Sequence, residues 1–177
     1  SMKDKNPDAF VGFTYPPDTI LASKQAKEVG FNPKFFYASV GTAFQLYKNV
    51  MTPAGAEGVL GMGSWNAKTS AGAKAYFDAH VKKFAGKEPD RWASGACWAA
   101  LEILTAAVGK HGLERKAIRD YVAGTEHQTI LGKIRFNGSE NVGTPGSVSQ
   151  WQNGEFEVVW PKAIATAALN ANKPAWK

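Results

Sequence analysis

The first forty residues predict a strand, a helix and a second strand. Residues 9–13 form a short, nearly continuous apolar run, and residues 34–37 form a second one, as is typical of parallel strands covered on both faces. Between them, Asp18 can cap a helix with its carboxylate, and Gly30 can end the helix in a left-handed turn. A unit of this length has a right-handed crossover and predicts a parallel pair of strands.

Apolar periodicity predicts four further helices. A short helix over residues 44–51 is closed by Thr52-Pro53, and an amphipathic helix starts at Thr69-Ser70. The last of the four helices covers residues 114–122. The third helix covers residues 91–109, with Asp90 as its cap. It is apolar nearly all round, which predicts burial between other layers. Cys97 lies in this helix and is therefore predicted to be a buried structural thiol.

The remaining strands are predicted from a change of period and from turn residues. Residues 57–63 form a glycine-rich third strand, and residues 130–136 read as one strand with an irregularity at Gly132. Two apolar runs, residues 148–152 and 155–160, flank Asn153-Gly154, which is a strong signal for a type I′ hairpin.

Composition and motifs exclude several function classes. The chain has 177 residues and a net charge of +6, but its basic residues are scattered rather than interleaved with aromatic residues, so we expect no nucleic-acid partner. No apolar run approaches ~20 residues, the length of a membrane-spanning helix. The three histidines, His80, His111 and His127, lack the spacing of a metal site, and Asn66 interrupts the weak nucleotide-binding pattern that starts at Gly61. We therefore predict no metal, no cofactor and no catalytic residue.

Several segments together resemble one family of transport proteins. They are Pro7-Asp8-Ala9, Tyr15-Pro16, Ala26-Lys27-Glu28, Gly58-Val59-Leu60-Gly61, Leu131-Gly132-Lys133-Ile134-Arg135-Phe136 and Gln150-Trp151-Gln152-Asn153-Gly154. In this order and spacing they are similar to the C-terminal half of branched-chain-amino-acid-type (class I) periplasmic substrate-binding proteins, the solute receptors of ABC importers. The resemblance implies an α/β fold of three αβα layers with parallel sheets, a periplasmic location and an ABC permease as partner.

The resemblance also implies a division into lobes. Residues 3–66 would belong to the second lobe, residues 67–140 to the first lobe, and residues 141–177 to a crossover hairpin and C-terminal tail. The first part of both lobes would then be missing, and the chain, which shows no signal peptide, would be truncated at its N-terminus. Because parallel strands without their neighbours have open edges and uncovered apolar faces, we expect the truncated chain to form a homodimer.

Ligands of open parallel sheets bind beyond the carboxyl ends of the strands, which gives five candidate residues here. Thr14 and Tyr15 follow the first strand, and Ala38 and Ser39 follow the second. Tyr15 matches by position the ligand-contacting aromatic residue of the family; the alternative is a loop tyrosine packed on the prolines after it. Trp65 ends the third strand, either as a stacking platform for the ligand or as packing in the hinge.

The site of this chain lacks an acidic residue that the resemblance leads us to expect. Members that bind amino acids carry a carboxylate near Ala38, yet no Asp or Glu occurs between Glu28 and Glu57. An ammonium group without a partner is costly to bury. We therefore predict capture of a small carboxylate, aromatic ones included, by closure of two lobes. The alternatives are a receptor for branched-chain or other amino acids whose ammonium partner lies elsewhere, and a ligand-sensing regulator with the same fold.

Overall fold

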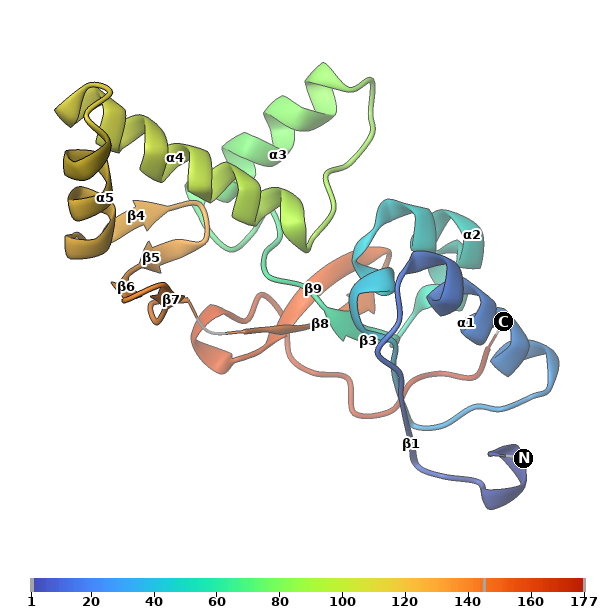
Figure 1. The fold of residues 1–177 in the computed structure, drawn as a ribbon. Helices are drawn as coiled ribbons and strands as arrows, with labels where there is room; N and C mark the ends of the chain where they lie inside the picture. Colours follow the sequence, from blue (N-terminus) through green and yellow to red (C-terminus); the bar gives the residue numbers. More distant parts are fainter. Residues whose placement is uncertain (1, 145, 177) are drawn as a thin grey trace.

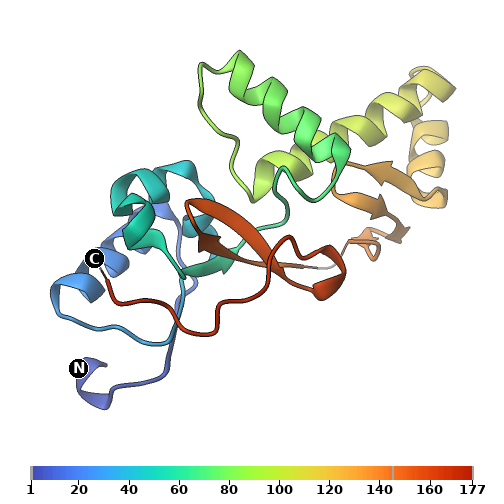
Figure 2. The same ribbon diagram turned by 180° about the vertical axis from the view of Figure 1, so that it is seen from behind.

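The secondary-structure elements form two bodies (Figure 1). The computed structural model describes residues 2–144 and 146–176. The sheet body, residues 3–62 and 148–176, contains the main sheet, two helices and a C-terminal tail. The helical body, residues 71–141, contains three helices and two small hairpins. The chain crosses from the sheet body to the helical body after the third strand and returns before the eighth (Figures 1 and 2).

The main sheet begins with parallel strands and ends with an antiparallel hairpin. Its order in the described residues is β1-β2-β3-β8-β9. The strands β1 (Ala9–Val11), β2 (Phe35–Tyr37) and β3 (Leu60–Met62) are parallel, whereas β8 (Val148–Gln152) and β9 (Glu155–Trp160) are antiparallel. The predicted α/β class with a parallel strand–helix–strand start is confirmed, although each of the three parallel strands is shorter than predicted.

The helices α1 (Pro16–Glu28) and α2 (Gln45–Ala56) pack against each other on one face of the sheet, as two right-handed crossovers in the same direction require. The prediction that Asp18 caps α1 is wrong. The helix begins at Pro16 with Tyr15 as its N-cap, because the two prolines preset the helical φ of the first turn. Gly30 has a φ of 68°, which confirms the left-handed turn after α1.

The regular part of α2 ends where the sequence predicts. Thr52 has a φ of 65° and a ψ of 158°, and this non-helical residue separates the longer first part from a single turn that follows. Pro53 lacks an N–H group and its ring crowds the preceding turn, so the helix cannot continue through it unbroken.

β1 and its loop are more exposed than the sequence predicts. We predicted a strand covered on both faces, but Val11 is 61% exposed and Phe13 in the following loop is 81% exposed. This prediction is wrong for the described structure, because β1 pairs only with β2 and no described element lies beyond its other edge.

The two hairpins test the turn predictions. Asn153 and Gly154 have φ values of 52° and 80°, so both central residues are left-handed and the predicted type I′ turn between β8 and β9 is confirmed. The predicted single strand over residues 130–136 is wrong. Gly132, with a φ of 92°, instead helps to reverse the chain between β4 (His127–Thr129) and β5 (Gly132–Ile134), which pair antiparallel.

A second small hairpin, β6 (Phe136–Asn137) with β7 (Glu140–Asn141), follows around Gly138. The three-residue 3-10 helices η1 (Lys3–Lys5) and η3 (Lys162–Ile164) lie near the two ends of the sheet body.

Polar side chains start the helices of the helical body. Before α3 (Ala71–Lys83), Ser70 Oγ accepts a hydrogen bond of 3.0 Å from the N–H of Ala73. Before α4 (Ala93–His111), Asp90 Oδ1 accepts hydrogen bonds from three successive N–H groups, at 2.6–3.2 Å. The predicted start at Thr69-Ser70 is thereby confirmed, whereas α4 begins two residues later than predicted, with Asp90 still binding its first N–H groups. α5 (Arg115–Gly124) lies close to its predicted range.

The prediction that α4 is buried all round is wrong. One face, every fourth residue from Gly95 to Ala107, is buried, but Leu101 on another face is 56% exposed. Cys97 is also exposed, so the predicted buried thiol is wrong as well. No described helix is long and apolar enough to cross a membrane.

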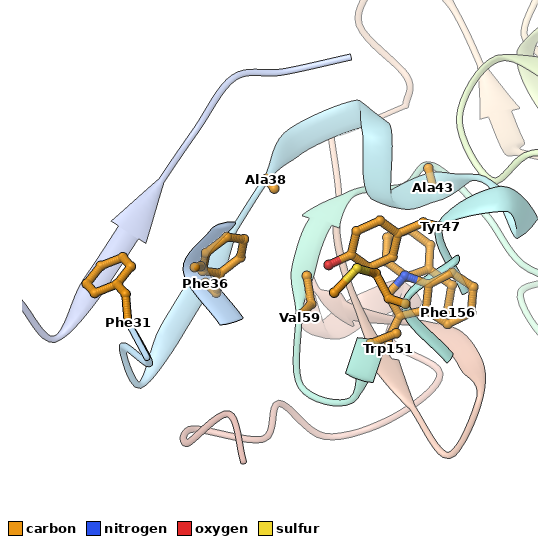
Figure 3. Close-up of a cluster of buried hydrophobic side chains, with 11 residues drawn as sticks. Phe31, Phe36, Ala38, Ala43, Tyr47, Val59, Trp151 and Phe156 are labelled. Carbon is orange, nitrogen blue, oxygen red and sulfur yellow. The ribbon is translucent and has the colours of Figure 1, made fainter. Parts of the chain in front are cut away.

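The largest apolar core lies in the sheet body (Figure 3). Tyr47 from α2 packs there with Val59, Trp151 and Phe156, all of which are almost fully buried. Burial raises the pKa of the Tyr47 phenol, whose hydroxyl lies 2.9 Å from Ser23 Oγ. This core holds the carboxyl ends of the parallel strands in place.

Candidate ligand-binding site

The carboxyl ends of β1 and β2 bring four predicted site residues together. Thr14 and Tyr15 follow β1, and Ala38 and Ser39 follow β2. The backbones of the two loops are joined by a hydrogen bond of 3.2 Å from the Gly41 N–H to the Thr14 carbonyl. The four residues therefore lie together at the end of the sheet, where Tyr15 is exposed and Ala38 and Ser39 are buried.

Hydroxyl groups fix the distance between these two loops. Thr14 Oγ1 and Thr19 Oγ1 lie 2.7 Å apart, and 3.3 and 3.2 Å from the Ala38 carbonyl, so one hydroxyl donates to the other, which donates to the carbonyl. The Thr14 hydroxyl is therefore already used within the protein. Ala38 is 1% exposed and contributes its carbonyl to this network rather than its side chain.

The turn after β2 has an unusual backbone. Ser39 has a φ of 49° although it is not glycine, and it opens the 3-10 helix η2 (Ser39–Ala43). Thr42 Oγ1 donates to the Ser39 carbonyl at 2.8 Å, and a Cβ on Gly61 would lie 1.6 Å from Thr42 Oγ1. Left-handed residues that their surroundings hold in place are frequent at binding sites, where they fix the path of the backbone.

Tyr15 and Trp92, which come from the chain segments of different bodies, meet at this surface, where Trp92 packs against the core of the sheet body. Tyr15 is 63% exposed, and its ring meets that of Trp92 edge to face with a centroid distance of 6.3 Å. Trp92 is half-buried and directly precedes α4. Trp92 is not among the site residues predicted from the sequence, although its position two residues after Asp90 indicates a helix end.

Trp65 lies apart from the other predicted site residues. Its side chain has no exposed surface, and its ring lies 5.3 Å from that of Tyr76 between centroids. The Arg91 guanidinium lies 5.6 Å from the Trp65 ring, and a Cβ on Gly95 would approach that ring to 2.6 Å. Of the two roles considered for Trp65, the structure favours packing in the hinge.

The charged groups of Arg91, Lys48 and Glu88, close to Trp92 in the sequence or in space, are already paired. Arg91, which is 5% exposed, forms an ion pair of 2.8 Å with Glu88, and Lys48 of α2 approaches the same carboxylate at 3.3 Å. Asp90 is the acidic residue nearest Trp92 in the sequence, and its Oδ1 binds the start of α4. In the described ranges, no group of three His, Cys, Asp or Glu residues could hold a metal ion. Besides the carboxylate of Asp18 in the first turn of α1, the surface offers the aromatic rings of Tyr15 and Trp92.

A two-body α/β architecture with a surface at the strand ends between the bodies is the arrangement of solute-binding proteins. The profile of the periplasmic binding protein family (Peripla_BP_6) matches residues 1–155. The chain therefore belongs to this family.

Solved structures of solute-binding proteins share the fold. A solute-binding protein of an ABC transporter from R. palustris, in complex with benzoate, matches 97% of this chain with a TM-score of 0.73 and 16% identity. A branched-chain amino acid transporter substrate-binding protein from Streptococcus pneumoniae, in complex with isoleucine, matches 87% with a TM-score of 0.69 and 20% identity. A leucine-binding protein from Thermotoga maritima matches 86% with a TM-score of 0.67 and 22% identity.

The chain covers less than half of each of these structures: 47%, 45% and 43% of their lengths in the same order. The likeness confirms the predicted class I periplasmic-binding-protein fold and the resemblance to part of such a protein.

Proposed function

We propose that this chain is part of an extracytoplasmic solute-binding component of an ABC importer and that it has no catalytic role. The family supports a location outside the cytoplasm and a permease as partner. The observation that carries the proposal is the meeting of Tyr15 and Trp92, which come from different bodies, at the carboxyl ends of β1 and β2. A solute held between them would bind both bodies at once and favour their closure.

In this proposal the two bodies correspond to parts of two lobes. The sheet body supplies part of the second lobe, and the helical body supplies part of the first. Ligand contacts come from Tyr15 and Trp92, and the buried Ala38 and Ser39 fix the backbone behind Tyr15. The Thr14 hydroxyl binds within the protein, and Trp65 stabilises the hinge.

The proposed ligand is a small carboxylate that needs no ammonium group, with aromatic acids included. Residues 29–56, which contain the turn after β2, carry no acidic side chain. The aromatic rings of Tyr15 and Trp92 suit an apolar ligand body, whereas an ammonium group would lack a carboxylate partner on this turn. The benzoate complex of the R. palustris protein is in keeping with this ligand class.

A receptor for branched-chain amino acids is the second candidate. Two of the structures with the same fold are a leucine-binding protein and an isoleucine complex. In such a receptor, the carboxylate that pairs with the ligand ammonium would come from outside the turn after β2.

Calorimetric titration of the natural full-length protein distinguishes these candidates. Benzoate and a cinnamate represent the first, and leucine, isoleucine and glutamate represent the second. We expect binding of an acid without an ammonium group. Sub-micromolar binding of an amino acid, with no response to the other acids, would establish the second candidate instead.

A further inference from the structure

Two adjacent residues anchor the first crossing between the bodies, one in each body. Trp65 is buried against α3 and the start of α4 in the helical body. Asn66, which is 6% exposed, turns to the sheet body, where its Nδ2 donates to Thr166 Oγ1 at 2.8 Å. We call Trp65 and Asn66 the hinge pin. The return crossing before β8 and a hydrogen bond of 2.8 Å from the Arg91 N–H to the Ala43 carbonyl also join the bodies, so the pin is one of several connections that any rotation has to accommodate.

A buried carboxylate completes the sheet-body side of the pin. Glu157 of β9 is 6% exposed, and its Oε2 accepts a hydrogen bond of 2.6 Å from Thr166 Oγ1 and lies 3.2 Å from Asn66 Nδ2. Thr166 Oγ1 in turn accepts the N–H of Val158 at 2.9 Å. Asn66, Glu157 and Thr166 therefore satisfy one another in a largely buried site, and such networks are rigid when every member has a partner.

The other carboxylate oxygen of Glu157 contacts the chain just after the hinge pin. Its Oε1 forms an ion pair with Lys68 Nζ. Lys68 lies in the turn that leads into α3, where its N–H donates to Asn66 Oδ1 at 2.8 Å, and its side chain is 56% exposed. This ion pair thus joins the turn that leads into the helical body to the hydrogen-bonded network of the sheet body.

We propose that Lys68 is a positioning residue for closure: its ion pair with Glu157 restrains rotation about the hinge pin and sets the arrangement of the two bodies in the ligand-free protein. The proposal rests on the proposed function, because restraint of this rotation matters for solute capture only if the bodies close on a ligand. Without this restraint, the two bodies of the ligand-free protein adopt more relative orientations, and a smaller fraction of molecules is ready to close on a ligand. Ligand affinity therefore falls.

Distance measurement between two spin labels in the ligand-free, natural full-length protein tests the restraint directly. The labels are placed by Lys24→Cys on α1 and Leu113→Cys beyond α4, in a Cys97→Ser background, since Cys97 is exposed. We expect Lys68→Met to broaden or shift the distance distribution and Lys68→Arg to restore it. Glu157→Gln should act like Lys68→Met, and combining the two should add nothing further.

Lys74→Met is the matched control. Lys74 forms an ion pair with Asp78 within α3, so this variant removes the same charge and one ion pair without touching the hinge. Equal distance distributions for Lys68→Met, Lys74→Met and the parent protein, all folded by circular dichroism, would overturn the proposal. A lower melting temperature of Lys68→Met with an unchanged distribution would also overturn it, since Lys68 would then serve stability alone.

Titration with benzoate and isoleucine separates this proposal from the proposed function. We expect Lys68→Met to weaken binding of whichever acid binds by about two- to fivefold, the scale of a partly exposed ion pair. If neither these acids nor the others in the panel bind, the proposed function fails, whereas the label distances still decide the role of Lys68.

Discussion

A single glycine determines how closely Trp65 approaches α4. A Cβ built on Gly95 would lie 2.6 Å from the Trp65 ring, and the ring is enclosed on its other sides. Gly95→Ala should therefore lower the free energy of unfolding by about 1–3 kcal/mol, as is usual for overpacking a core. Denaturant unfolding of the natural full-length protein measures this change.

Gly109→Ala is the control on the same helix. A Cβ there would meet nothing within 4 Å, so alanine should be neutral or stabilise α4 by up to about 1 kcal/mol. If both variants shift the free energy of unfolding equally, the close contact between Gly95 and Trp65 does not exist.

Residue-scale predictions from the sequence succeeded where the cause is local. The left-handed turn at Asn153-Gly154 and the caps at Ser70 and Asp90 depend on neighbours within four residues. The proximity of Tyr15 and Trp92 depends on how the two bodies meet, and no periodicity or spacing reveals it.

At the scale of elements, the C-terminal tail is held by a buried lysine. The Lys173 N–H donates to the Lys34 carbonyl at 2.8 Å, and Lys173 Nζ donates to Asn32 Oδ1 at 2.6 Å beside the Trp176 ring. The ring of Trp176 packs edge to face on Phe36 of β2. The sequence offered few fold signals in this tail and no role for Trp176, because both depend on a partner more than a hundred residues away.

Burial lowers the pKa of Lys173 to about 8, from about 10.5 in the unfolded chain. Between these pH values the unfolded chain binds more protons, so this residue makes the free energy of unfolding rise with pH. Lys173→Met should remove that rise between about pH 8 and 10.5. Denaturant unfolding at several pH values checks it, with Lys162→Met, an exposed lysine of the same tail, as control. A wild-type-like pH dependence in Lys173→Met would contradict the prediction.

The burial of whole elements was the least predictable feature from sequence. α4 was predicted to be buried all round, yet its Trp98–Leu101 side is exposed, and β1 lies at an open edge. An apolar sequence indicates that a face prefers to be covered, but which segment covers it is decided by the rest of the fold.

For the whole molecule, these exposed faces support the prediction that the 177-residue chain forms a homodimer. Leaving several large apolar side chains in water costs roughly 1.5–3 kcal/mol each, which is large against a typical stability of about 5–15 kcal/mol. We expect light scattering of the isolated 177-residue chain to give twice the monomer mass at micromolar concentration. A monomer that unfolds cooperatively would contradict this prediction.

The central claim is that a solute binds between Tyr15 of the sheet body and Trp92 of the helical body. Calorimetric titration of the natural full-length protein tests this most directly. Wild type, Tyr15→Ala and Trp92→Ala are titrated with whichever of benzoate, a cinnamate, leucine, isoleucine and glutamate binds wild type most tightly. The account predicts that each variant stays folded and loses about 1–3 kcal/mol of binding free energy, the scale of a buried aromatic contact. Wild-type affinity in both folded variants would contradict it and place the ligand elsewhere.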